Sequence, residues 1–233
     1  MILFIALTVF LLLTVAFIKA KVSEAVKEHG DSKSGVNEDK PKEAKRLFST
    51  KQLVFSGVAL AIAFVLSFIK VIDMPWGGSV TLCSMLFVTI IGYWYGPAIG
   101  LVTALAYGVL QFVQDGGGYI LSPMQVAFDF ILAFMALGVS GFFNKKKNGL
   151  IIGYIIAILL RGLMHAIGGY IYWMDYMPDN FPKNLAVIYP ILYNYAYIIP
   201  EGVITVVLLL ISPVKKGIAY ISRLAEDQGV ISG

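Results

Sequence analysis

Seven long apolar segments constrain the fold of this chain more than any other feature of its sequence. They cover residues 1–18, 53–72, 81–95, 98–113, 121–143, 149–173 and 187–212. A helix needs about 20 mostly apolar residues to cross the hydrocarbon core of a bilayer. Only 14% of the 233 residues are charged, whereas soluble domains carry roughly 25%. The sequence therefore predicts an all-α membrane protein with a six-helix core, preceded by one extra N-terminal transmembrane helix.

The first apolar segment and the charged stretch after it are expected to stand apart from the core. Lysines follow residues 1–18 instead of preceding them, which favours an uncleaved transmembrane anchor over a cleaved secretory signal. Residues 19–50 are polar and highly charged, as is typical of a linker without a packed core. The predicted core then covers residues 51–214, and residues 215–233 form a tail.

The distribution of charge predicts the orientation of the core in the plasma membrane. If six core helices alternate in direction, then the linker, the lysine run at 145–147 and the C-terminal tail share one side. The loops on the other side hold four aspartates and a single lysine. Because basic loops stay in the cytoplasm, the linker and the C-terminus are expected to be cytoplasmic. The net charge of +4 is thereby explained without a nucleic-acid partner.

Polar side chains inside the predicted spans indicate a candidate site, because such groups usually face a cavity or a partner. Asp129 and His165 lie eight residues, and Asn194 seven residues, from the outer ends of their segments. At 1.5 Å per residue, all three lie about 10–12 Å below the outer surface. Aromatic residues gather at the same outer mouth: Trp76, Tyr119, Tyr172, Trp173 and Tyr189.

This combination of side chains is suited to one class of ligand. A carboxylate, an imidazole and an amide beneath aromatic walls suit a flat heteroaromatic molecule that carries positive charge. Each aromatic residue taken alone is equally typical of the belt at a membrane surface. The common depth of the three polar residues is what favours a shared pocket open to the outside.

Arg161 and Glu201 lie deeper, near the middle of the membrane. Arg161 is twelve residues from the cytoplasmic end of its segment, and Glu201 is fourteen residues from the outer end of the last. A structural ion pair between these helices is favoured, since it removes two isolated charges from hydrocarbon. A proton relay is the alternative.

Small residues follow one another along the first core segment, at Gly57, Ala59, Ala61 and Ala63. The spacings Gly57-xxx-Ala61 and Ala59-xxx-Ala63 permit close approach of another helix. Either packing inside this chain or docking onto a second membrane protein would use such a strip.

Several motifs are missing from the sequence, and their absence narrows the function. The chain has no G-x-x-x-x-G-K-[ST] phosphate loop, so it is not expected to hydrolyse ATP through such a loop. Cys83 is the single cysteine and His29 the second histidine, so no metal site is expected. No internal repeat of the kind found in stand-alone secondary transporters is evident. A non-enzymatic binding subunit is therefore expected.

Residues 53–212 resemble the thiamine-specific substrate-binding subunits (S-components) of energy-coupling factor transporters. The resemblance is carried by MPWGGSVT at 74–81, YILSPMQVAFDFILAF at 119–134, LLRGLMHAIGGYIYW at 159–173 and IYPILYNYAYIIPE at 188–201. It implies an outward-facing thiamine site. The implied ligand-binding residues are Trp76, Tyr119, Asp129, His165, Trp173, Tyr189 and Asn194.

The same resemblance implies partners for this chain. These are a transmembrane coupling protein, docked on the small-residue strip, and two cytoplasmic ATPases; no cofactor is implied beyond the ligand itself. The chain departs from the family where Asp129 is followed by Phe130, since Glu followed by Tyr occurs there. Three alternatives remain: a related vitamin or thiamine precursor as ligand, a stand-alone secondary transporter, or an intramembrane enzyme with Asp129 and His165 as acid and base.

Overall fold

The apolar segments of the core form helices, as their lengths predict. The protein was examined as a computed structural model that describes residues 48–115, 118 and 120–226. The expected anchor at 1–18, nearly all of the linker and Tyr119 lie outside the described residues. Five described helical segments are long and apolar enough to cross a membrane, and a shorter apolar helix covers Ser84–Tyr95. The predicted all-α membrane fold is thus confirmed, while the number of spans stays a prediction.

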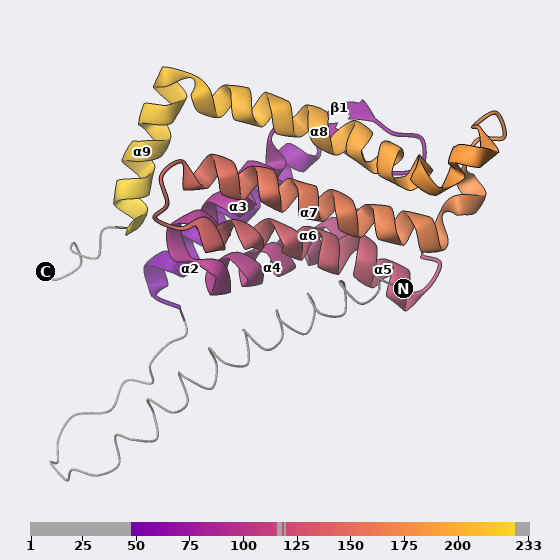
Figure 1. The fold of residues 1–233 in the computed structure, drawn as a ribbon. Helices are drawn as coiled ribbons and strands as arrows, with labels where there is room; N and C mark the ends of the chain where they lie inside the picture. The colour runs from indigo at the N-terminus through magenta and orange to yellow at the C-terminus, as the bar shows by residue number, and fades with distance from the viewer. Residues whose placement is uncertain (1–47, 116–117, 119, 227–233) are drawn as a thin grey trace, which may run out of the picture. The chain divides into compact units, whose positions relative to one another are not determined.

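The helices form one bundle (Figure 1), in which the short helix Ser84–Tyr95 packs against the helices before and after it in the sequence and also against Gly149–Tyr172. Their bounds are α2 (Thr50–Ser67), α3 (Ser84–Tyr95), α4 (Pro97–Asp115), α7 (Gly149–Tyr172) and α8 (Tyr189–Leu210). Where α4 crosses the segment before α7, a Cβ on Gly138 would lie 2.6 Å from the Cα of Leu101. A Cβ on Gly100 would in turn lie 2.9 Å from the carbonyl oxygen of Gly138. The two backbones can touch there because both glycines lack a side chain.

The fourth crossing, Pro123–Phe143, is an irregular helix. It consists of α5 (Pro123–Val126), a π-helical turn η2 (Ala127–Leu132), α6 (Ala133–Met135) and a 3₁₀ segment η3 (Ala136–Phe143). Its start is fixed by Ser122, whose Oγ accepts a hydrogen bond from the backbone N–H of Gln125 at 3.1 Å, as expected of an N-cap. Asp129 lies in the π-helical turn, and such turns are frequent at functional sites.

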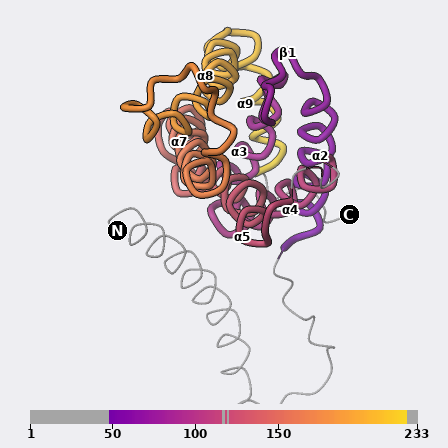
Figure 2. The backbone as a smooth tube through the Cα atoms, turned by 90° about the vertical axis from the view of Figure 1, so that its right-hand side faces the viewer, coloured from indigo at the N-terminus to yellow at the C-terminus, as the bar shows by residue number. Residues whose placement is uncertain are grey.

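A β-hairpin replaces the helix ends expected at residues 67–72 and 81–83. Strands β1 (Lys70–Asp73) and β2 (Ser79–Thr81) pair antiparallel, and Figure 2 shows β1 between α2 and α8. Gly77 and Gly78 in the connecting loop have φ angles of 88° and 82°, which favour glycine. Because α3 is 12 residues long, it spans only about 18 Å.

Residues that were predicted to form part of a tail continue as helix α9 (Ser212–Glu226). Figure 1 shows α9 turning away from the end of α8. Trp94 Nε1 donates a hydrogen bond to Ser222 Oγ at 2.7 Å, and Tyr95 OH donates to the carbonyl of Ala225 at 3.2 Å. These contacts attach α9 to the end of α3. That this end of the core is cytoplasmic stays a prediction.

The small-residue strip on α2 divides between two faces of the helix. Ala59 and Ala63 are 5% and 0% exposed, and the hydroxyl of Tyr107 donates to the carbonyl of Ala63 at 3.4 Å. The prediction that these two alanines dock a partner is therefore wrong, because they pack inside this chain. Gly57 and Ala61 are exposed, so a docking role for them stays a prediction.

Candidate ligand-binding site

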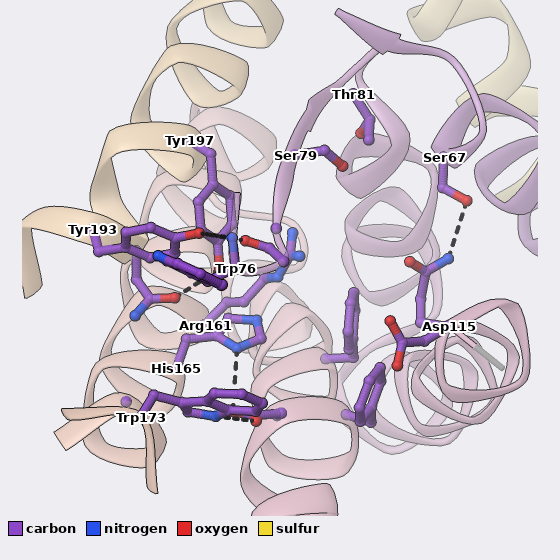
Figure 3. Close-up of a pocket in the computed structure, with 18 of the residues that line it drawn as sticks. Ser67, Trp76, Ser79, Thr81, Asp115, Arg161, His165, Trp173, Tyr193 and Tyr197 are labelled. Carbon is purple, nitrogen blue, oxygen red and sulfur yellow. Dashed lines mark hydrogen bonds and ion pairs between the residues drawn. The ribbon is translucent and has the colours of Figure 1, made fainter. Parts of the chain in front are cut away.

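A cavity of about 480 Å³ lies between the hairpin and helices α4, η2, α6, α7 and α8. Its volume falls within the range of small-molecule sites, about 300–1,000 Å³. Figure 3 shows aromatic and polar side chains around it. The structure brings together six of the seven predicted ligand-binding residues at its wall: Trp76, Asp129, His165, Trp173, Tyr189 and Asn194. That they bind a ligand stays a prediction.

The carboxylate of Asp129 is held in place by two donors. Its Oδ2 accepts hydrogen bonds from Gln125 Nε2 at 2.7 Å and from Trp173 Nε1 at 3.0 Å. A Cβ on Gly168 would lie 2.8 Å from Asp129 Oδ1, so glycine allows α7 to pass close to the carboxylate. The side chain of Asp129 is 15% exposed. A fixed, weakly solvated negative charge therefore faces the cavity, where it would attract a cation strongly.

His165 lies beside this carboxylate, on the wall formed by α7. Its Nδ1 is 3.8 Å from Asp129 Oδ1, a distance typical of electrostatic contact and too long for a hydrogen bond. The imidazole packs edge-on against Phe134 and Tyr197, with ring centroids 6.1 and 6.4 Å away. Its Nε2 is buried without a hydrogen-bond partner among the described residues.

Asn194 faces the same cavity from α8, but its amide is already hydrogen-bonded. Its Oδ1 accepts from the hydroxyl of Tyr197 and its Nδ2 donates to the carbonyl of Pro190, both at 2.8 Å. Tyr189, Tyr193 and Tyr197 follow one another at four-residue spacing on α8, and all three line the cavity. Tyr193 and Tyr197 were not predicted as site residues, although their four-residue spacing, which places residues on one helix face, is visible in the sequence.

The hairpin loop covers the cavity on the α8 side. The backbone N–H of Trp76 donates to the hydroxyl of Tyr193 at 2.8 Å, and this hydroxyl donates to the carbonyl of Gly77 at 3.1 Å. A Cβ on Gly78 would lie 2.5 Å from the ring of Tyr197. The indole of Trp76 stacks at a tilt on Tyr176, with centroids 5.4 Å apart. The loop is thus attached to α8 by hydrogen bonds and close packing.

The expected ion pair between Arg161 and Glu201 does not form. Among the described residues, the ion pairs within 4.0 Å join Lys70 to Asp73 and His165 to Asp129. Arg161 instead places its guanidinium carbon 4.4 Å from the ring centroid of Phe134, a cation–π geometry. The prediction was therefore wrong, although both residues line the same cavity.

Glu201 does not need the arginine because backbone and hydroxyl donors satisfy it. Its Oε2 accepts from the backbone N–H and the hydroxyl of Thr81, at 2.8 and 2.7 Å. Its Oε1 accepts from Ser84 Oγ at 3.3 Å and from the backbone N–H of Met85 at 3.4 Å. Because α3 starts at Ser84, its positive N-terminal end faces the carboxylate. Glu201 thereby joins α8 to strand β2 and to α3.

The charged side chains that line the cavity are mostly acidic. Among the described residues, three carboxylates and two cations line it: Asp115, Asp129, Glu201, Lys70 and Arg161. Of the two cations, Lys70 is paired with Asp73, which does not line the cavity. Among the described residues there is no group of three or more His, Cys, Asp or Glu that could hold a metal ion. An acidic, aromatic lining of this kind is suited to an aromatic ligand that carries positive charge.

Comparison with known proteins gives consistent results. The family model described as "Thiamine transporter protein (Thia_YuaJ)" matches residues 53–220. The thiamine transporter ThiT of Bacillus subtilis (strain 168) is 30% identical over 173 residues, which are 68% of this chain and 88% of that protein. A solved structure of ThiT from Listeria monocytogenes superposes with a TM-score of 0.55 at 28% identity. That match covers 70% of this chain and 94% of the other.

Proposed function

The chain belongs to the thiamine transporter protein family, whose model matches residues 53–220, and on this premise we propose that it is the substrate-binding subunit of an ATP-driven vitamin importer. Thiamine would be captured in the cavity from the outer face of the membrane. The observation that carries this proposal is the hydrogen-bonded carboxylate of Asp129 in an aromatic cavity whose charged lining is mostly acidic.

Thiamine fits these features because it is a cation made of two flat aromatic rings joined by a methylene group. The carboxylate of Asp129 would oppose its positive charge, at low exposure and therefore with little screening by water. The rings of Trp76, Trp173 and Tyr189 line the cavity and could stack on a heteroaromatic ring through dispersion and cation–π attraction. Binding by these contacts requires no covalent step.

The position of the cavity supports access from outside. Asp115, Trp173 and Tyr189, which line it, all lie at helix ends in the loops poor in basic residues. The lysines at 145–147 follow the opposite end of the fourth crossing. Because basic loops remain in the cytoplasm, the mouth of the cavity would open to the exterior.

Release of thiamine inward would depend on partner chains, since this sequence has no phosphate loop. We place the docking surface for a membrane coupling protein on the exposed face of α2, around Gly57 and Ala61. Small residues let helix backbones approach closely, and a Cβ on Gly57 would meet no atom within 4 Å. Two cytoplasmic ATPases would supply the energy.

Uptake of labelled thiamine tests the importer role and the docking surface together. In thiamine-depleted cells that carry an energy-coupling module, the wild-type chain should support uptake that stops when ATP is exhausted. Ala61→Trp should abolish uptake because the indole blocks close helix contact, while detergent-purified Ala61→Trp still binds thiamine. Val203→Trp is the control, because Val203 is 56% exposed on α8, whereas α2 packs against α3 and α4. Uptake that persists without ATP, or in Ala61→Trp, would contradict this coupling scheme.

A further inference from the structure

Among the described residues that line the cavity, Arg161 is a cation that neither the fold nor the proposed contacts to thiamine account for. It lines the cavity, and Figure 3 shows it beside His165. Its Nε is buried without a hydrogen-bond partner among the described residues. The contact seen for its guanidinium is the ring of Phe134, at 4.4 Å. A buried guanidinium is costly unless acceptors satisfy its N–H groups.

Arg161 and His165 form one continuous polar strip on α7. Residues four apart lie on the same helix face, and Arg161, His165, Gly169 and Trp173 all line the cavity. Arg161 therefore lies about 6 Å deeper than His165 along the helix axis. The Nε2 of His165 is also buried without a partner among the described residues. The inner half of this wall thus presents two unsatisfied nitrogens.

The neighbouring oxygens are already engaged with other groups. Both carboxylate oxygens of Glu201 accept hydrogen bonds from β2 and the start of α3. The hydroxyl of Ser84 pairs with that of Thr81 at 2.7 Å, and the hydroxyl of Tyr107 donates to a backbone carbonyl at 3.4 Å. At the inner end of the cavity, the guanidinium of Arg161 therefore remains available to donate hydrogen bonds to a ligand.

We propose that Arg161 binds a hydrogen-bond acceptor of the ligand, so that the inner end of the cavity is a second polar subsite, opposite in charge to the one at Asp129. This inference deepens the proposed function and rests on it. The two subsites together would select a ligand that places a positively charged ring near Asp129 and a hydrogen-bond acceptor deeper in the cavity. A flat cation without that acceptor would leave the guanidinium unsatisfied and would bind weakly.

Thiamine carries acceptors at both of its ends. One is the hydroxyl oxygen of the side chain on the thiazolium ring, and the others are the pyrimidine nitrogens. The hydroxyl oxygen and the pyrimidine nitrogens can both accept a hydrogen bond from Arg161, and analogues of thiamine show which of them does. One analogue has an ethyl group in place of the hydroxyethyl group, and others replace a single pyrimidine nitrogen with CH.

Isothermal titration of the purified protein in detergent tests the subsite. Arg161→Met, which keeps an unbranched apolar stem and removes the guanidinium with its donors, should weaken thiamine binding about 10- to 100-fold, the range for a hydrogen bond to a charged donor. Arg161→Lys should restore part of the affinity. Arg223→Met is the control: Arg223 is exposed on α9 and should leave binding unchanged.

The analogues distinguish a ligand contact from a general structural role. The analogue that lacks the acceptor contacted by Arg161 should bind the wild-type protein weakly. It should bind Arg161→Met with nearly the same affinity, because the interaction between Arg161 and that acceptor is already absent. Equal weakening of every ligand by Arg161→Met, or no weakening of any, would overturn the inference while leaving the proposed function intact. If wild type binds no thiamine, both the proposed function and this inference are wrong.

Discussion

Asp129→Asn is expected to weaken thiamine binding by at least about 100-fold. The substitution keeps the shape of the side chain but removes the negative charge that opposes the cation, and truncating one partner of a desolvated charge pair costs roughly 2–5 kcal/mol. The new amide would also direct a donor toward Gln125 Nε2 or Trp173 Nε1, which donate to this carboxylate at 2.7 and 3.0 Å. Isothermal titration calorimetry on the purified protein measures the change.

Asp175→Asn is the matched control for this variant. Asp175 lies in the short 3₁₀ helix η4 (Met174–Tyr176) next to Trp173, but it is exposed and does not line the cavity. Its contribution to the field in the cavity is screened by solvent, so we expect an affinity within about threefold of wild type. An affinity for Asp129→Asn as high as that of the control would show that the carboxylate does not bind the ligand.

Glu201→Ala is expected to destabilise the core by about 3–5 kcal/mol, the range for removing one partner from a buried charged group. Glu201 is 1% exposed, and its loss would leave the donors of Thr81, Ser84 and Met85 unsatisfied inside the core. The attachment of strand β2 to α8 would weaken, and with it the covering of the cavity. Denaturant unfolding in detergent, followed by circular dichroism, measures the loss.

Glu226→Ala is the comparison for the stability measurement. Glu226 is exposed at the end of α9, where a substitution usually changes stability by less than about 0.5 kcal/mol. Glu201→Gln should fall between the two, because its amide keeps one acceptor but directs its NH₂ group toward donors. A Glu201→Ala protein as stable as Glu226→Ala would show that the network around β2 and α3 does not stabilise the fold.

The sequence predicted the features of this fold that depend on period and depth. The apolar segments became helices, and Asp129, His165 and Asn194, chosen because they lie at one depth in three helices, came to one cavity. Depth is readable from sequence because every helical residue advances 1.5 Å. The direction in which a side chain points around the helix is less certain, and for this reason Ala59 and Ala63 were assigned to the wrong face of α2.

The hairpin and the surroundings of Glu201 could not be predicted in the same way. Residues 70–72 and 81 were read as the ends of helices on either side of a loop at 73–80. They instead form part of strands that pair with each other, and β2 also contacts α8. Depth alone paired Arg161 with Glu201, because both lie near mid-membrane. The true partners of Glu201 are backbone and hydroxyl groups of β2 and α3, which the segment boundaries from sequence had placed inside a continuous helix.

Native mass spectrometry tests most directly whether this cavity captures thiamine. The purified full-length protein is mixed with equimolar thiamine, riboflavin, biotin and pyridoxine, and the mass of the complex is measured. Our account predicts a single species that carries one thiamine molecule per chain. A protein that retains a different vitamin, or that emerges without thiamine at micromolar concentrations, would contradict it.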